Sequence, residues 1–184
     1  MNHIVKELFL MNEKILIACD STADLGPELI ARYGIQVLPL GVTLGNKEYT
    51  DGVDIDPDFI YAHYEKTGQL PKTSAINLAD FEDFFTRLTA DGSSVIFFTI
   101  SSEMSSTYNN SRMAAEEFEN VYVIDTKNLS TGGGLLVLSA ALMAAEGMEA
   151  EEIVEKSDSL DDIGDAPEDL EELFSEPPLL ELDF

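Results

Sequence analysis

Hydrophobic residues along this chain fall into short continuous runs, and longer stretches of mixed polar and apolar residues separate them. Such runs are typical of buried strands, and the strands predicted from them lie at residues 14–19, 35–40, 95–100 and 121–124. The mixed stretches predict helices at residues 24–33, 56–67, 78–90, 108–118 and 135–145, with another beginning at 149–156. Strands that alternate with helices predict an α/β fold, a layered α/β/α domain with a mainly parallel sheet.

Local signals at the ends of these segments support the assignment. Asp24, Asp56 and Asn77 each precede a predicted helix and are suited to cap its first turn. Pro39 lies within the second apolar run, and because proline cannot donate a ladder hydrogen bond, that run is predicted to be an edge strand or a strand end. Residues 44–47 (LGNK) are typical of a tight turn.

Polar, hydroxyl-rich segments follow three of the predicted strands, at residues 20–22, 99–105 and 125–130. Because the carboxyl ends of parallel strands meet at one edge of a sheet, we expect these segments to share one cleft. Residues 99–108 (TISSEMSSTY) also lead into a helix, whose first N–H groups can bind an anion together with the hydroxyls. The residues alone leave open whether one serine is a nucleophile or whether all are hydrogen-bond donors.

Charge is the most unusual feature of the composition. Ten Lys and Arg stand against 36 Asp and Glu, a net charge of −26 that argues against nucleic acid and anionic membranes as partners. Residues 157–184 hold eleven acids and no Lys or Arg, so we predict an acidic, solvated tail after a domain at residues 14–156, with residues 1–13 as an N-terminal extension. Residues 4–10 are too short and too charged for a signal peptide or a membrane span, so a cytoplasmic protein without stable membrane insertion is expected.

Few residues suit catalysis or metal binding. The chain has one cysteine, Cys19, and two histidines, and no metal-binding spacing, so we expect neither a metal nor a cofactor. Asp20 follows a strand as in aspartyl phosphotransferases, but Thr22 occupies the place of their second Asp, and a loop residue that anchors the backbone is favoured. Residues 132–134 (GGG) suit either a phosphate cradle or close helix packing.

Several stretches together resemble the DegV family of bacterial fatty-acid-binding proteins. They are residues 20–24 (DSTAD), 49–56 (YTDGVDID), 71–77 (PKTSAIN), 100–108 (ISSEMSSTY) and 129–136 (LSTGGGLL). The similarity runs from about residue 14 to 156 in family order. One departure is Ser106, which stands where the family has glycine.

The resemblance implies a binding protein and not an enzyme. A long-chain fatty acid would be buried in an apolar tunnel and presented to an ATP-dependent fatty acid kinase, which converts the carboxylate to an acyl phosphate. By motif position, Thr73 and Ser105 would bind the carboxylate. The supporting positions would be Ser74, Asn77, Ser101 and Ser102, and those lining the cleft would be Asp20, Ser21 and Thr22.

Family members continue into a second domain, which the sequence is expected to lack, so we expect weak binding by this chain alone. Two alternatives stand beside the leading hypothesis. The chain could be an interaction protein without tight lipid binding that docks through its acidic tail, at residues 170–174 or 179–184. The other alternative is a small phosphatase or hydrolase that uses Asp20 or a serine.

Overall fold

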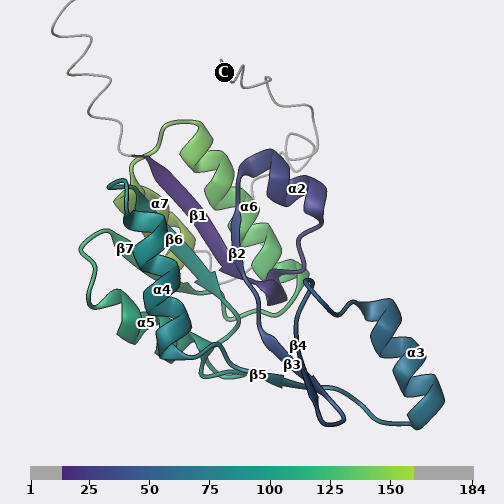
Figure 1. Ribbon diagram of the computed structural model, residues 1–184. Coiled ribbons are helices and arrows are strands. Elements are labelled where there is room, and N and C mark those ends of the chain that lie inside the picture. Colours follow the sequence, from purple (N-terminus) through teal and green to yellow (C-terminus); the bar gives the residue numbers. More distant parts are fainter. Residues whose placement is uncertain (1–13, 160–184) are drawn as a thin grey trace, which may run out of the picture.

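A four-stranded parallel sheet forms the centre of the computed structural model, which describes residues 14–159 (Figure 1). Its strands lie in the order β2-β1-β6-β7. Their bounds are β1 Ile15–Asp20, β2 Gln36–Leu38, β6 Ser94–Thr99 and β7 Val121–Asp125. All three pairings are parallel, and β2 is an edge strand, as Pro39 predicts.

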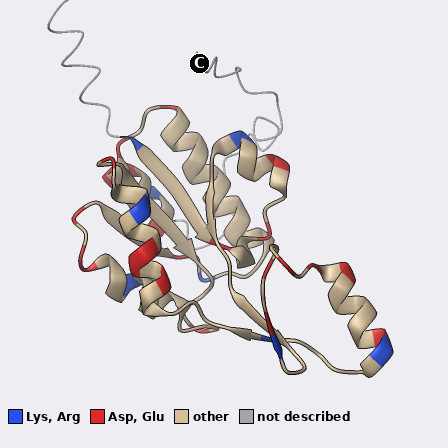
Figure 2. Cartoon of the chain, in the orientation of Figure 1, with Lys and Arg blue, Asp and Glu red and all other residues tan. Residues whose placement is uncertain are grey.

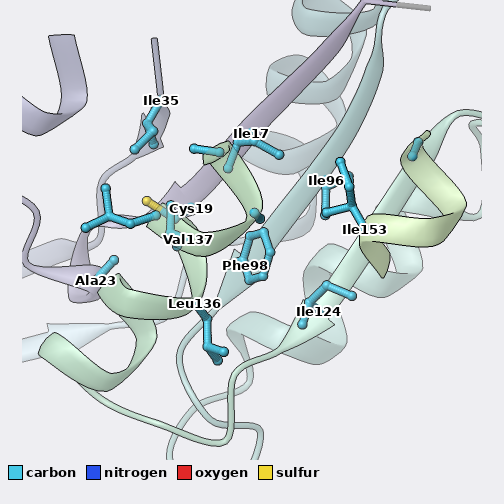
Figure 3. Packing of buried hydrophobic residues seen from close by; sticks show 14 residues of the cluster. Ile17, Cys19, Ala23, Ile35, Ile96, Phe98, Ile124, Leu136, Val137 and Ile153 are labelled. Atoms are coloured by element: carbon cyan, nitrogen blue, oxygen red, sulfur yellow. The ribbon is translucent and has the colours of Figure 1, made fainter. Parts of the chain in front are cut away.

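Helices cover both faces of this sheet, which confirms the predicted α/β/α layering. On one face lie α2 (Pro27–Tyr33), α6 (Thr131–Ala145) and α7 (Ala150–Ser159). Alternate strand residues pack against them, as Figure 3 shows for Ile17, Cys19 and Phe98 next to Val137. Successive side chains of a strand point to opposite faces, so the continuous apolar runs follow from burial on both sides.

The opposite face packs against α4 (Leu78–Thr89) and α5 (Thr107–Ala115). Phe81, Phe84 and Phe85 of α4 surround Phe97 of β6 in edge-to-face contacts, with ring centroids 5.3 to 5.9 Å apart. Such pairs contribute about 0.5–1.5 kcal/mol each beyond their buried area. This packing fixes α4 to β6, and so places the start of α4 relative to the segment that follows β6.

A second, antiparallel sheet lies beside the first and was not predicted. It contains β4 (Lys47–Thr50), β3 (Gly41–Leu44) and β5 (Lys72–Ser74), in the order β4-β3-β5. The predicted tight turn joins β3 to β4, with Gly45 at a φ of 66°. The helix α3 (Pro57–Thr67) follows and projects away from the central sheet (Figure 1).

Several predicted boundaries differ from the structure, among them the end of α5, which lies at Ala115 and not at residue 118. The cap assigned to Asp24 was wrong, because α2 begins after Gly26, and Asp24 instead ends the short 3-10 helix η1 (Ser21–Ala23) at a φ of 51°. The helix α6 begins at Thr131, four residues before the prediction, so it includes the three glycines. The helix α7 runs through residue 159, past the boundary predicted at 156.

The N-terminal extension at residues 1–13 lies outside the described residues. So do the tail from residue 160 onward and its two candidate docking segments, 170–174 and 179–184. Among the helices of residues 14–159, none has the length and the apolar character that a membrane crossing requires.

Candidate functional site

The segment between β6 and α5, residues 100–106, is called the serine turn below. Three consecutive N–H groups of this turn donate to its neighbours. Ile100 donates to Asp20 Oδ2 (2.8 Å), Ser101 to the carbonyl of Asn128 (3.0 Å) and Ser102 to Asp125 Oδ1 (3.0 Å). The three segments that follow β1, β6 and β7 therefore meet at one edge of the sheet, as the sequence predicts.

Asp20 lies at the centre of this junction and is only 1 % exposed. Its carboxylate accepts hydrogen bonds from the N–H of Thr22, the hydroxyl of Thr22 and the N–H of Ile100. Burial raises the pKa of Asp20 above its ordinary value, and the hydrogen bonds from Thr22 and Ile100 lower it in part. A carboxylate whose two oxygens are already bonded to the backbone acts as an anchor, as the sequence favoured.

Ser21 and Thr22 also accept hydrogen bonds from backbone N–H groups of neighbouring segments. Ser21 Oγ accepts from the N–H of Leu40 (3.1 Å), and the carbonyl of Thr22 accepts from the N–H of Ser130 (2.9 Å). The cavity beside them measures about 10 Å³, which is room for about one water molecule. Asp20 and Thr22 line this small cavity, and the part of Asp20, Ser21 and Thr22 in a ligand cleft stays a prediction.

Ser101 shapes the serine turn from within. Its side chain is buried, and Ser101 Oγ accepts from the N–H of Glu103 (3.3 Å). Its carbonyl accepts from the N–H groups of Met104 (3.0 Å) and Ser105 (3.2 Å). Ser102 is half-buried, and its N–H is bonded to Asp125. These two serines hold the turn in place.

Ser105 stands at the start of α5. Its Oγ lies 2.9 Å from Thr107 Oγ1 and accepts from the N–H of Thr107 (3.2 Å). In the part of the chain that the structure describes, the N–H groups of Tyr108 and Asn109 in the first turn of α5 have no hydrogen-bond partner. A half-buried hydroxyl beside unpaired N–H groups at the positive end of a helix is a favourable place for a carboxylate.

Thr73 and Ser74 come from the second sheet. Both are exposed on β5, where Thr73 pairs with Val42 and Ser74 with Gly41. A pocket of about 290 Å³ lies beside them and is lined by Gly41, Val42, Thr43, Glu48, Tyr49, Thr50 and Ser74. A methyl group added to Gly41 would meet Ser74 Oγ, so the glycine leaves room for that hydroxyl.

The segment after β5 connects this second sheet to the serine turn. Asn110 of α5 donates through Nδ2 to the carbonyl of Ile76 (2.7 Å). Next to it, Asn77 caps α4, because Asn77 Oδ1 accepts from the N–H of Asp80 (2.9 Å) and Nδ2 donates to the Asp80 carboxylate (2.7 Å). Asn77 therefore has a helix-capping role, and its part in ligand binding stays a prediction, as do those of Thr73 and Ser105.

The sequence interpretation selected the segments that contain Thr107 and Asp125 but gave neither residue a role of its own. Thr107 is fully buried, with its hydroxyl against Ser105, and Asp125 accepts from the N–H groups of Ser102 and Lys127. The role of Asp125 as a backbone anchor could have been predicted, because it directly follows the buried run 121–124 as Asp20 follows its own. Thr107 carries no such signal.

The described residues contain no group of three or more His, Cys, Asp and Glu that could hold a metal ion. His63 lies on α3, which projects away from β6 and α5, and His3 is outside the described residues (Figure 1). Figure 2 shows the Lys and Arg residues scattered over different elements among more numerous acids. The serine turn thus offers neutral hydrogen-bond donors. This favours the hypothesis that its serines donate hydrogen bonds over the hypothesis that one of them is a nucleophile.

The chain is similar to one family of proteins, both in sequence and in fold. The family model described as "Uncharacterised protein, DegV family" matches residues 14–163. A DegV domain-containing protein of Clostridium acetobutylicum is 35 % identical over 147 residues, which cover 78 % of this chain and 52 % of the relative. The chain spans about half the length of the curated relatives it matches.

Two solved structures have the same fold. The first is described as "Fatty Acid Binding of a DegV family Protein from Thermus thermophilus"; it is 32 % identical with a TM-score of 0.75, over 80 % of this chain and 53 % of that one. The second is a stearic-acid-binding protein from Eubacterium ventriosum, 31 % identical with a TM-score of 0.71, over 77 % of this chain and 51 % of that one.

Proposed function

This chain belongs to the DegV family, and on that premise we propose that it binds the carboxylate of a long-chain fatty acid at the start of α5. Ser105 is the principal ligand, and Thr73 of β5 is the second. Ser74, Asn77, Ser101 and Ser102 support them, and Asp20, Ser21 and Thr22 form the base of the site. The observation that carries the proposal is the Ser105 hydroxyl beside the unpaired N–H groups of Tyr108 and Asn109.

The chemistry of these groups supports the proposal. Hydroxyl and N–H donors hold a carboxylate by charge-assisted hydrogen bonds without a neighbouring cation, which suits a chain of net charge −26. Each buried CH₂ group of the acyl chain contributes about 0.8 kcal/mol. The relatives from Thermus thermophilus and Eubacterium ventriosum, named for fatty acid and stearic acid, support the same class of ligand.

The proposed role is that of a carrier and not of an enzyme. The bound acid would be presented to an ATP-dependent fatty acid kinase in the cytoplasm, which phosphorylates the carboxylate. A hydrolase based on Ser105 would need a general base, and the hydroxyl of Thr107 that lies against it is not one. We propose residues 14–159 as the carboxylate-binding domain, with its end moved from the predicted residue 156 to the end of α7, preceded by the extension 1–13 and followed by the acidic tail.

Isothermal titration calorimetry with oleate tests the proposal. We expect saturable binding, and Thr73→Ala and Ser105→Ala should each weaken it by about 10-fold or more, since a hydrogen bond to a charged group is worth about 1.5–3 kcal/mol. Thr86→Ala is the matched control, because Thr86 is an exposed hydroxyl residue on α4. Equal affinities for Ser105→Ala and Thr86→Ala would contradict the proposed site.

A further inference from the structure

We propose that Asp20 and Asp125 are positioning residues that hold the serine turn from the two strands flanking β6, and that asparagine can replace Asp125 but not Asp20. The inference rests on the proposed function only where it concerns ligand affinity. The hydrogen bonds that carry it are independent of any ligand.

The sheet order places the two carboxylates on opposite sides of the turn. β6 lies between β1 and β7, and Asp20 and Asp125 are the last residues of those two strands. Asp20 accepts from the N–H of Ile100 at 2.8 Å, and Asp125 accepts from the N–H of Ser102 at 3.0 Å. Ser101, which lies between Ile100 and Ser102 in the chain, donates through its N–H to the carbonyl of Asn128. The start of the turn is thereby held at three successive residues.

The fixed part of the turn sets the position of Ser105. The carbonyl of Ser101 accepts from the N–H of Ser105 at 3.2 Å, and Ser105 Oγ in turn accepts from the N–H of Thr107. A displacement of Ser101 or Ser102 therefore moves the hydroxyl that we assign to the ligand. Neither carboxylate needs to touch the ligand for this effect.

Asp125 uses one of its two oxygens. The N–H groups of Ser102 and Lys127 both donate to Oδ1, at 3.0 Å each, and within residues 14–159 Oδ2 has no partner. An asparagine keeps a carbonyl oxygen in the place of Oδ1 and puts its NH₂ group where nothing needs to be accepted. Asp125→Asn should therefore preserve the turn, whereas Asp125→Ala should release Ser102.

Asp20 uses both oxygens in a buried position. Oδ1 accepts from the N–H and the hydroxyl of Thr22, and Oδ2 accepts from the N–H of Ile100. An asparagine here would turn its NH₂ group toward one of these backbone N–H donors whichever way the amide is oriented. Because Asp20 is only 1 % exposed, bulk solvent does not reach the mismatched pair of donors.

Amide hydrogen exchange of the whole chain, followed by NMR, tests the hydrogen bonds without any ligand. We expect Asp125→Ala to speed exchange at Ser102 by about 10-fold or more, since a hydrogen bond to a carboxylate is worth about that much, and Asp125→Asn, which keeps a neutral acceptor, to speed it clearly less. Asp20→Asn should speed exchange at Ile100. Asp83→Ala, at an exposed position on α4, is the control.

Two exchange results would overturn the inference. If Asp125→Asn exposes Ser102 as much as Asp125→Ala does, the charge of Asp125 matters and its hydrogen bonds do not. If neither Asp125 variant changes the exchange at Ser102, the bond does not hold the turn.

Oleate titration of the same variants tests the effect on the ligand site. We expect the affinity of Asp125→Asn to match wild type, and those of Asp125→Ala and Asp20→Asn to fall, with the urea midpoint of Asp125→Ala close to that of Asp125→Asn. Loss of affinity in Asp125→Asn would contradict the inference. A wild-type chain that binds no oleate would refute the proposed function, and the exchange data would still decide the role of the two carboxylates.

Discussion

The sequence left two explanations open for the glycines at residues 132–134, close helix packing and a phosphate cradle. Replacing Gly134 or Gly133 by alanine tests the packing explanation. Both glycines are buried in the first turn of α6. A methyl group on Gly134 would lie 2.6 Å from the backbone carbonyl oxygen of Ala23, and 3.3 Å from Leu25 Cδ2. A methyl group on Gly133 would meet Thr126 Oγ1 at 3.5 Å, an ordinary van der Waals contact.

The two substitutions are therefore expected to change stability in opposite directions. Alanine is favoured over glycine inside a helix by about 1 kcal/mol, and Gly133→Ala should gain most of that. Gly134→Ala gains the same term, but it forces α6 away from a backbone atom that cannot rotate aside, and overpacking of this kind costs about 1–3 kcal/mol or more. We expect Gly134→Ala to be less stable than Gly133→Ala by about 1–3 kcal/mol, which is a difference of about 2–10 °C in the melting temperature of a domain this size.

Urea denaturation followed by circular dichroism measures this difference, with both variants and wild type at one pH. The packing explanation predicts a higher midpoint for Gly133→Ala and a lower one for Gly134→Ala. If Gly134→Ala is as stable as Gly133→Ala, the close approach of α6 to Ala23 does not constrain the position, and the reasoning is refuted.

Three further predictions concern the buried groups of the sheet. Cys19, which is 1 % exposed and has a pKa that burial raises to about 12, should react with iodoacetamide only when urea unfolds the chain; rapid labelling of the native protein would contradict this. The pKa of Asp20 is raised above 3.8 by burial and by the charge of Asp24, so the folded state binds its proton more tightly and its contribution to stability falls as the pH rises through the raised pKa. Asp20→Asn should remove that slope, and urea titrations at several pH values should show the stability difference between wild type and variant changing with pH; a constant difference would be evidence against it. Phe85→Ala should cost about 3–5 kcal/mol in urea denaturation, since Phe85 is fully buried against Phe97, and a loss under 1 kcal/mol would disprove tight packing there.

The parallel sheet was predictable because burial on both faces leaves a visible pattern. The runs at residues 95–98 and 121–124 are apolar throughout, and their partners for packing come from both sides. Asp56 and Asn77 were also predictable as helix caps, since their roles depend on the next three residues alone.

The second sheet was less visible, because its strands are short and one of them, β5, comes from a distant part of the chain. Gly41–Leu44 is short and follows Pro39, and it becomes a strand by pairing with Lys47–Thr50 and Lys72–Ser74. The 3-10 helix that ends at Asp24 was missed although its cause is local: the carboxylate of Asp20 accepts from the N–H of Thr22 and turns the chain before α2 begins.

The candidate site divides in the same way. The serine turn could be placed at the sheet edge from its position after a buried strand, and its hydroxyls marked it as a donor site. The use of each hydroxyl could not be predicted, because Ser101 Oγ is bonded within the turn while Ser105 Oγ lies at the start of α5 beside Thr107. Which hydroxyl stays within the turn and which reaches the start of α5 depends on the backbone conformation of the serine turn.

The most direct test of the central claim is an NMR titration of the ¹⁵N-labelled chain with oleate carrying ¹³C at its carboxyl carbon. The account predicts saturable shifts of that carbon together with the amides of Thr73, Ser105, Tyr108 and Asn109, and no such shifts with the methyl ester. If the carboxyl signal stays unchanged up to the solubility limit of oleate, or if the amide shifts cluster away from the start of α5, the assignment of the carboxylate site is wrong.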